Sequence, residues 1–327
     1  MPSRLGLQLV VAIFCRFLLK TGRRFVYPFA AMVSGALGVS LVAITMLLAL
    51  NQVAAILSPF FGQMSDRWGY RTMMGWGLIV ASLAMLAVGL LPSYTVLMFG
   101  LLAIGIGISI CDPALHAYVG MRVPFAQRGQ VMGLTELAWA ASSLVGIPVA
   151  GWLVQSHSWN MPFMVMGVLG LCGATLLRWL LPSSTYNYIP KKTRLLSVSR
   201  SLLQRPTVRA MLCYAFLVSC ASDIFFVTYA LWLADGFRMG VVTLGLATIA
   251  IGVAELGGEL LTATLADRLG LGRTMLVTLL ITALCYALLP LWGYTATGAV
   301  IGIFLLCLAA EFNLVAAISL STEIQPN

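Results

Sequence analysis

The chain has 327 residues, of which 61% are hydrophobic and 9% charged, and its formal net charge is +9. Its mean hydropathy of +0.99 lies far outside the range of soluble domains, which excludes an ordinary soluble protein. Apolar runs of about 20 residues recur along the whole chain, without the alternating pattern of an outer-membrane barrel. The composition therefore predicts an all-α, polytopic helical membrane protein.

Ten membrane spans are predicted in chain order. We place them at 8–34, 40–61, 73–91, 95–120, 130–154, 161–181, 208–233, 240–264, 274–292 and 296–320. A helix of about 20 residues is long enough to cross about 30 Å of hydrocarbon. The chain is therefore expected to form a bundle of membrane-spanning helices joined by short loops.

Lysine and arginine gather in alternate joints between these spans. The joints at 62–72, 121–129, 182–207 and 265–273 hold eleven of them, whereas the opposite joints hold only Arg238. Because positive charge marks the cytoplasmic side, we expect a cell (inner) membrane protein with a cytoplasmic N-terminus. The basic excess then reflects orientation and attraction to the lipid bilayer, and nucleic-acid binding is not implied.

Four cations lie inside the first predicted span: Arg16, Lys20, Arg23 and Arg24. A helix that started after Arg24 would have only about a dozen residues, or about 18 Å, before the outer surface, which is too short to cross. On a helix the four positions share an arc of about 100°, and a cation at mid-membrane costs about 2.5–3.5 kcal/mol. We expect this cation stripe to face protein or water. The alternative, that Arg16 and Lys20 extend to the cytoplasmic surface, stays open.

Six of the ten carboxylates lie within predicted spans. They are Asp112, Glu136, Asp223, Glu255, Glu259 and Glu311. Charges at one depth on many helices predict a polar central cavity, although static ion pairs that hold the bundle together would account for them too. We assign Asp223, Glu255, Glu259 and Glu311, which lie in the second part of the chain, to a substrate cavity.

The remaining two acids lie in the same part of the chain as the cation stripe. Asp112 and His116 share a helical face at a spacing of four residues. We predict that Arg24 lies within reach of a buried acid, with Asp112 and Glu136 as the expected partners, or lines a polar cavity. His116 would relay a proton to Asp112 or be a satisfied structural histidine. The predicted set for proton coupling is Lys20, Arg23, Arg24, Asp112, His116 and Glu136.

Two joints carry the same motif. GQMSDRWGYR at 62–71 reads G-x-x-x-D-R-x-G-x-R, and TATLADRLGLGR at 262–273 repeats D-R-x-G with a trailing arginine, 201 residues later. On this repeated motif the chain resembles the major facilitator superfamily over essentially its whole length. The resemblance implies two pseudo-symmetric halves, here six helices plus four. They are an N-terminal half at 1–185, a cytoplasmic linker at 186–206 and an incomplete C-terminal half at 207–327, with the last two helices missing.

The resemblance also implies a cytoplasmic gate at these joints. Gly62 and Gly69 would permit tight turns, and Asp66 would meet a helix N-terminus, where a negative charge is favourable. The full gate set is Gly62, Asp66, Arg67, Gly69, Arg71, Asp267, Arg268, Gly270 and Arg273. VGIPVAGW at 145–152 resembles a degenerate Gly-Pro motif of proton antiporters, or is ordinary close packing. The fourth span lacks the arginine that many proton-coupled members carry, which argues against carrying over their mechanism.

The leading functional prediction is secondary active transport by alternating access, as proton-coupled efflux of a small amphiphile or metabolite. Lysolipid or sugar transport on the same fold is an alternative, and so is a non-transporting membrane sensor or assembly partner. The sequence has neither HExxH nor GxSxG, so an enzyme is not expected. The seven cysteines are scattered singly, and neither metal nor cofactor is predicted. The expected partners are a small-molecule substrate, protons and the lipid bilayer.

Overall fold

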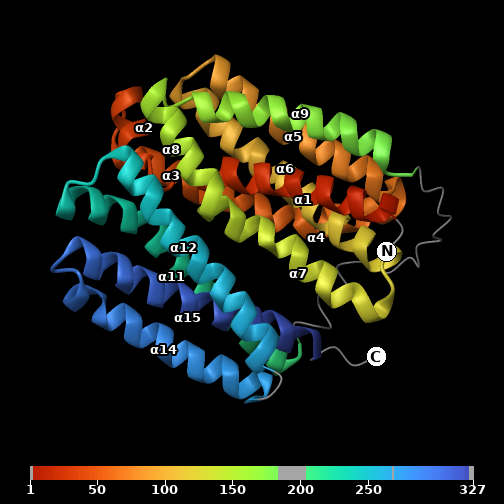
Figure 1. The fold of residues 1–327 in the computed structure, drawn as a ribbon. Helices are drawn as coiled ribbons and strands as arrows, with labels where there is room; N and C mark the ends of the chain where they lie inside the picture. Colours follow the sequence, from red (N-terminus) through yellow and green to blue (C-terminus); the bar gives the residue numbers. More distant parts are fainter. Residues whose placement is uncertain (1–2, 183–203, 267–268, 324–327) are drawn as a thin grey trace. The chain divides into compact units, whose positions relative to one another are not determined.

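The computed structural model describes residues 3–182, 204–266 and 269–323. Every regular element in that part of the chain is helical, and ten helical runs there are long and apolar enough to cross a membrane (Figure 1). The runs are Leu5–Arg24, Leu41–Ser65, Tyr70–Leu90, Tyr94–Arg122, Val131–Ser156, Met161–Leu180, Pro206–Phe237, Val241–Leu261, Leu271–Trp292 and Ala296–Leu320. The predicted all-α membrane fold and its ten spans are confirmed.

The chain divides into two compact units, and each is a body of its own. Unit 1 comprises Met1–Tyr188 and Met239–Gly252, and unit 2 comprises Ile189–Arg238 and Val253–Asn327. Unit 1 therefore takes in the first part of a helix that the predicted division gives to the C-terminal half. The predicted boundaries at 185 and 207 remain predictions, since residues 183–203 lie outside the described part.

Nine α-helices of unit 1 precede the long joint. They are α1 (Ser3–Arg24), α2 (Ala30–Leu37), α3 (Leu41–Val53), α4 (Ser58–Trp68), α5 (Tyr70–Leu90), α6 (Tyr94–Arg122), α7 (Phe125–Ala141), α8 (Ile147–Ser156) and α9 (Met161–Leu180). The later helices are α11 (Pro206–Phe237), α12 (Val241–Leu261), α14 (Leu271–Trp292) and α15 (Ala296–Glu323). A boundary at Gly252 divides α12 between the two units.

The first two predicted spans are broken rather than continuous. The first stops being helical after Arg24 and resumes at Ala30, with Pro28 in the turn between them. Proline has no N–H to continue the helix and disfavours the helical conformation of the residue before it. The second span changes to a short 3₁₀ turn at Ala54–Leu57 before α4 begins. Both breaks lie in runs whose hydropathy alone predicts one uninterrupted helix.

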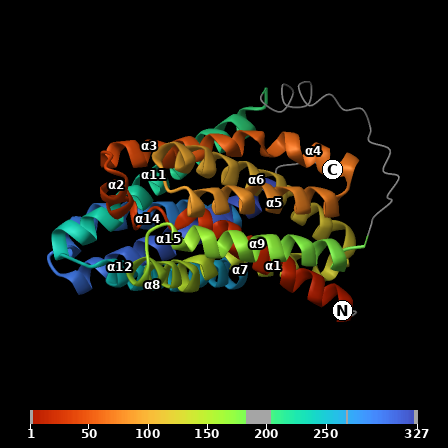
Figure 2. The ribbon, with the colours of Figure 1, turned by 90° about the horizontal axis from the view of Figure 1, so that it is seen from above.

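Helix α5 lies between α6 and α9, as Figure 1 and Figure 2 show from two directions. On one side Gly77 meets Gly107, and a Cβ placed on Gly77 would lie 2.6 Å from the Gly107 carbonyl oxygen. On the other side a Cβ on Gly167 would lie 2.9 Å from the backbone nitrogen of Leu86. Glycine is required at these positions because the backbones of neighbouring helices nearly touch. This rigid three-helix packing supports α6, which carries two of the predicted site residues.

Candidate functional site: a buried charge cluster

Helix α1 carries its cations into the interior of unit 1. Arg16 is 3% exposed, Lys20 6% and Arg24 5%, whereas Arg23 is half-buried. These side chains therefore do not extend to the surface, and the predicted stripe does face protein. The alternative in which Arg16 and Lys20 reach the cytoplasmic surface is wrong.

Asp112 on α6 binds two cations of α1 at once. Its Oδ1 accepts from Arg16 Nε at 3.1 Å, and its Oδ2 accepts from Lys20 Nζ at 2.6 Å. Both cations lie on one face of α1 because they are four residues apart. The carboxylate is thus held at both oxygens by charge-assisted hydrogen bonds, which are the strong kind.

Glu136 on α7 binds the other end of the same arginine. Arg16 Nη1 lies 2.9 Å from Glu136 Oε1, and Nη2 donates to Oε2 at 3.1 Å. Nη1 also donates to the carbonyl of Thr135 at 2.5 Å. One guanidinium therefore bridges the acids of two helices, and all of its nitrogens have partners.

His116 extends this group toward the surface. Its Nε2 lies 3.3 Å from Glu136 Oε1, and the side chains of His116 and Glu136 are 37% and 46% exposed. His116 and Asp112 share a face of α6, but the imidazole contacts the acid of α7, and the proton relay between His116 and Asp112 remains a prediction. We call Arg16, Lys20, Asp112, His116 and Glu136 the charge cluster.

Arg24 takes other partners than those predicted. Asp112 and Glu136 are bound by Arg16, Lys20 and His116, so these two acids are not the partners of Arg24 that we expected; contact of Arg24 with another buried acid or a polar cavity remains a prediction. The reason is the break after Arg24, which places this residue at the end of α1, about two turns beyond Arg16. Arg24 Nη1 instead donates to the Trp139 carbonyl at 3.0 Å and to Ser142 Oγ at 3.2 Å.

Trp139 was not predicted as a site residue. The Arg24 guanidinium lies 4.0 Å from its ring centroid, Lys20 Nζ 5.6 Å and the Arg23 guanidinium 5.8 Å. A tryptophan face attracts cations through its quadrupole. The available signal was its spacing, since Trp139 follows Glu136 by three residues and so shares its helical face.

The helix that carries Glu136 and Trp139 changes geometry directly after them. Ser142–Gly146 forms a π-helical turn, and α8 starts with a proline in its first turn. Such turns occur frequently at functional sites. A Cβ on Gly146 would lie 2.2 Å from Thr21 Oγ1, so α1 approaches this turn closely. This observation favours close packing for the VGIPVAGW segment.

The four acids predicted for a substrate cavity lie on three helices. Glu255 is 2% exposed, and Asp223, Glu259 and Glu311 are half-buried. A Cβ on Gly258 of α12 would lie 2.7 Å from the Glu311 Cβ of α15, so these two helices meet beside Glu259. A shared cavity of the four acids remains a prediction.

Unit 2 also contains a buried neutral network that the sequence did not reveal. Asn313 on α15 is 1% exposed and donates to the Met275 carbonyl at 2.8 Å and to Thr278 Oγ1 at 3.0 Å. Its Oδ1 accepts a hydrogen bond from the Tyr214 hydroxyl. The network joins α11, α14 and α15 without any charge.

One glycine in each predicted gate joint has the same backbone conformation as its counterpart. Gly69 has φ 84° and ψ 140°, and Gly270 has φ 83° and ψ 128°. Both angles lie in a region that only glycine adopts easily. Gly62 differs: it lies inside α4, so the prediction that it forms a tight turn is wrong.

The charged gate residues are described only in part. Arg67 and Arg273 are exposed, and Arg71 donates through Nη2 to the Arg178 carbonyl. Asp66 belongs to the last turn of α4, and its side chain lies outside the described part, so its approach to a helix N-terminus remains a prediction. Asp267 and Arg268 also lie outside the described residues.

No group of three or more histidine, cysteine, aspartate or glutamate side chains that could hold a metal ion occurs within residues 3–182, 204–266 and 269–323. The charge cluster can instead redistribute protons and ion pairs. It combines two acids, an arginine, a lysine and an imidazole, and its exposed end is formed by His116 and Glu136.

A family model described as Major Facilitator Superfamily matches residues 12–325. The uncharacterized MFS-type transporter YceJ of Bacillus subtilis is 25% identical over 72% of this chain and 60% of its own length. The chromaffin granule amine transporter of Rattus norvegicus is 27% identical over 72% of this chain and 45% of its own. Multidrug resistance protein MdtH of Shigella flexneri is 26% identical over 57% of this chain and 41% of its own. The chain thus spans between 41% and 60% of the length of these relatives.

Solved transporters share the fold at low sequence identity. A bacterial homolog of the human lysosomal transporter Spinster has a TM-score of 0.77 and 16% identity, over 100% of this chain and 77% of its own. A D-xylose-proton symporter has a TM-score of 0.76 and 17% identity, over 99% of this chain and 84% of its own. At such identities the likeness establishes the fold alone.

Proposed function

The chain belongs to the Major Facilitator Superfamily, and from this premise we propose that it moves a small molecule across the membrane by alternating access, coupled to protons. The names of its relatives include multidrug resistance proteins and an amine transporter, which supports efflux of a small amphiphile. One structural neighbour is a proton symporter, which supports the choice of coupling ion. The proposed location is the cell (inner) membrane with a cytoplasmic N-terminus, as the distribution of lysine and arginine favours.

The single observation that carries the proposal is the double binding of Asp112. An acid that carries a coupling proton must be charged in one state of the cycle and neutral in another. When Asp112 is charged, its two oxygens accept from Arg16 and Lys20. A protonated carboxyl keeps only one full acceptor oxygen and gains a donor, so at least one of these contacts must weaken. Protonation of Asp112 would therefore weaken the contacts between α6 and α1.

Arg16 links this event to the second acid. Its Nε donates to Asp112, and its two terminal nitrogens contact Glu136. Loss of charge on either acid leaves the guanidinium with one carboxylate, toward which it can shift. Motion of α1 between α6 and α7 would thus follow the protonation state of the pair.

Glu136 and His116 are the proposed entry point for the proton. Both side chains are more than a third exposed, whereas Arg16 and Lys20 are nearly fully buried. An imidazole can both donate and accept a proton, and the Nε2 of His116 lies 3.3 Å from Glu136 Oε1. The acids Asp223, Glu255, Glu259 and Glu311 are proposed to contact the substrate.

The test is proton-coupled flux in proteoliposomes that contain the full chain and a pH-sensitive dye. Amphiphilic amines, sugars and lysophospholipids are added as separate panels, and we expect one panel to produce proton movement. Asp112→Asn should abolish uptake driven by a pH gradient while exchange without a gradient continues. Asp235→Asn is the matched control, because it removes an exposed carboxylate outside the charge cluster, and it should transport normally.

Two results would contradict the proposal. Concentrative uptake by both Asp112→Asn and Glu136→Gln would show that neither acid carries the proton, and the cluster would be structural. Absence of flux with every panel, from a folded and correctly inserted protein, would favour a non-transporting membrane protein.

A further inference from the structure

A cavity of unit 2 lies between the end of α12, the part of α14 from Arg273 to Cys285, and α15. Its volume is about 700 Å³, within the range of about 300–1,000 Å³ that small-molecule sites have. All of its described lining belongs to unit 2, so one body forms it. We call this cavity the α14 groove. Its lining consists of Leu261, Leu269, Arg273, Thr274, Val277, Thr278, Ile281, Cys285, Leu305, Leu308, Ala309 and Phe312.

The α14 groove has a charged end and an apolar end. Arg273, in the first turn of α14, is exposed and is the one charged residue among the twelve described lining residues. The hydroxyls of Thr274 and Thr278 donate to the carbonyls of Gly270 and Thr274 at 3.1 and 2.7 Å, so they are bound within their own helix. Beyond Thr278 the lining that α14 contributes is apolar as far as Cys285. The groove therefore suits a ligand with an anionic group at one end of an apolar chain.

The length of the groove matches the depth of one lipid leaflet. Twelve positions separate Arg273 from Cys285, which is about 18 Å along a helix. One leaflet supplies half of the hydrocarbon thickness of about 30 Å, or about 15 Å. In the proposed orientation Arg273 lies at the cytoplasmic membrane edge, where anionic headgroups gather beside basic side chains. A lipid of that leaflet could thus extend one acyl chain along the whole groove.

The groove lies beside a helix contact that differs between the units. In unit 1 a Cβ placed on Gly77 of α5 would lie 2.6 Å from the Gly107 carbonyl oxygen of α6, so these two backbones nearly touch. The equivalent residue of α14, 201 positions later, is Thr278. It contacts α15, its neighbour in Figure 1, through a hydrogen bond from Asn313 Nδ2 at 3.0 Å. A contact between two side chains leaves more room beside it than a contact between two backbones.

A helix that packed on α14 as α9 packs on α5 would not fill the groove. Helix α9 meets α5 at Ser82, whose carbonyl oxygen would lie 2.9 Å from a Cβ on Gly167. The residue equivalent to Ser82 is Ala283, 201 positions later. Ala283 follows the groove residue Ile281 by two positions, which places it about 200° around the helix. The groove and the face equivalent to the α9 contact are therefore on opposite sides of α14.

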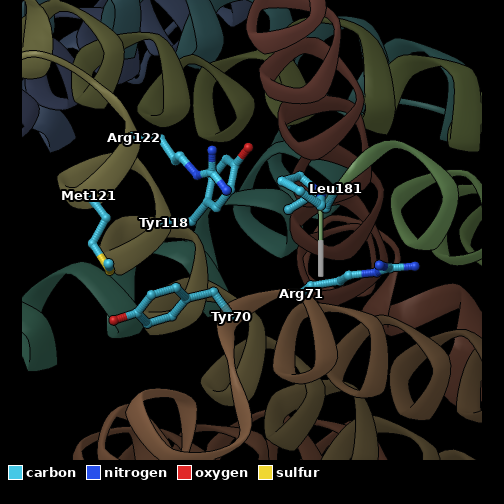
Figure 3. Close-up of a pocket in the computed structure, with 7 residues that line it drawn as sticks. Tyr70, Arg71, Tyr118, Met121, Arg122 and Leu181 are labelled. Atoms are coloured by element: carbon cyan, nitrogen blue, oxygen red, sulfur yellow. The ribbon is translucent and has the colours of Figure 1, made fainter. Parts of the chain in front are cut away.

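A second cavity, in unit 1, lacks this division into a charged and an apolar end. It has a volume of about 300 Å³ and lies at the start of α5, with Arg71 and Arg122 in its lining. Figure 3 shows that these two arginines do not converge on one point. Arg71 Nη2 already donates to the Arg178 carbonyl. The α14 groove is thus the better site for a charged ligand with a chain.

We propose that the α14 groove binds one acyl chain of an anionic phospholipid of the cytoplasmic leaflet, with its headgroup at Arg273. The apolar lining, which includes Leu308 and Phe312, supplies contact area for the chain, and the arginine selects the charge of the headgroup. The bound lipid would contact α14, α15 and the end of α12 and hold these helices together. The site contains no residue of the charge cluster, so the proposal goes beyond transport and does not depend on it.

The experiment counts lipids bound to the full chain in detergent by native mass spectrometry. Dioleoyl phosphatidylglycerol, dioleoyl phosphatidylcholine and dihexanoyl phosphatidylglycerol are titrated separately. We expect one dioleoyl phosphatidylglycerol to bind at the lowest concentration, because it alone has both the negative charge and the long chains. Arg273→Gln should weaken its binding about fivefold, the effect of one basic side chain near anionic lipid, and leave the binding of dioleoyl phosphatidylcholine unchanged.

Two variants fill the groove. Leu305→Trp and Val277→Trp each place a larger side chain in it and should weaken the binding of both long-chain lipids. Leu305 and Val277 are 37% and 53% exposed, so neither substitution enlarges a fully buried side chain. Leu280→Trp and Arg209→Gln are the matched controls, since both change exposed residues that do not line the groove. Both controls should bind lipid as the wild type does.

Three results would overturn the proposal. Equal affinity of the wild type for the two long-chain lipids would show that the headgroup charge is not recognised, and equal affinity for long-chain and short-chain phosphatidylglycerol would show that the chain is not bound. Wild-type binding by folded Leu305→Trp and Val277→Trp would place the lipid elsewhere. A protein dimer that Leu305→Trp separates and Leu280→Trp does not would assign the groove to a second copy of the chain.

Discussion

The helix pair α5 and α6 in unit 1 and the pair α14 and α15 in unit 2 start from the same turn but pack differently. Gly69 and Gly270, at the start of the pairs, have φ angles of 84° and 83°. Eight residues after Gly69, a Cβ placed on Gly77 would lie 2.6 Å from the Gly107 carbonyl oxygen. Eight residues after Gly270, Thr278 accepts a hydrogen bond from Asn313 at 3.0 Å. The repeated motif thus has the same turn in both units. The helix contact eight residues later is a close backbone contact in unit 1 and a side-chain hydrogen bond in unit 2.

The buried polar groups differ in the same way. The charge cluster of unit 1 is built from ionised side chains, whereas the network around Asn313 in unit 2 is neutral. An ion pair that loses one partner leaves a buried charge, and a neutral network leaves only an unpaired dipole. Only the first kind can gain a proton on a carboxylate, so the two networks should respond differently to pH, although unit 2 also contains the buried acid Glu255.

The largest effect is expected from Arg16→Met. It leaves Asp112 and Glu136 without their shared cation, which should destabilise the fold by about 3–5 kcal/mol, as for other broken buried ion pairs. Asn313→Leu should cost less, about 1–3 kcal/mol, because the groups left behind are neutral. Thermal unfolding in one detergent measures both, with Arg209→Met as an exposed control. Equal losses for Arg16→Met and Asn313→Leu would remove the contrast between the units.

An intermediate effect is expected at the two equivalent helix positions. Gly77→Val adds a side chain against the Gly107 carbonyl and should cost about 3 kcal/mol through overpacking. Thr278→Val keeps the volume and removes one hydroxyl, which should cost about 1 kcal/mol. The unfolding midpoints of the two variants measure both losses of stability, and that of Gly77→Val should be the larger. A larger loss for Thr278→Val would mean that the polar contact is the tighter of the two.

The smallest effect is expected at the turns themselves. Gly69→Ala and Gly270→Ala each place a Cβ on backbone of positive φ, and the expected cost of this strain is about 1–2 kcal/mol. At Gly270 the added Cβ would meet nothing else within 4 Å. The two losses should agree, because the angles agree. Gly35→Ala is the control, since Gly35 is helical and its Cβ would also be unobstructed. Clearly unequal losses at the two turns would show that the repeat is one of sequence only.

Much of the fold could be predicted because each crossing of the membrane requires an apolar run of about 20 residues. Ten apolar runs became ten spanning helices, and the count of residues before the second run placed Arg16 and Lys20 inside the first. The breaks after Arg24 and at Ala54–Leu57 could not be predicted from hydropathy, since the segments are as apolar as their neighbours. Their position decided which cation met which acid.

The sequence by itself determined that the cations of α1 lie inside the first span, because few residues remain to cross the bilayer, and that the acids at positions 112 and 136 lie within later spans. It also determined the two glycine turns, since the D-R-x-G motif occurs twice. Only the tertiary structure decided that Arg16 joins Asp112 to Glu136, that His116 faces Glu136, and that Trp139 receives Arg24. Pairing of side chains depends on the rotation and depth of each helix against its neighbours, and close contacts such as the one at Gly146 fix these only when the helices pack.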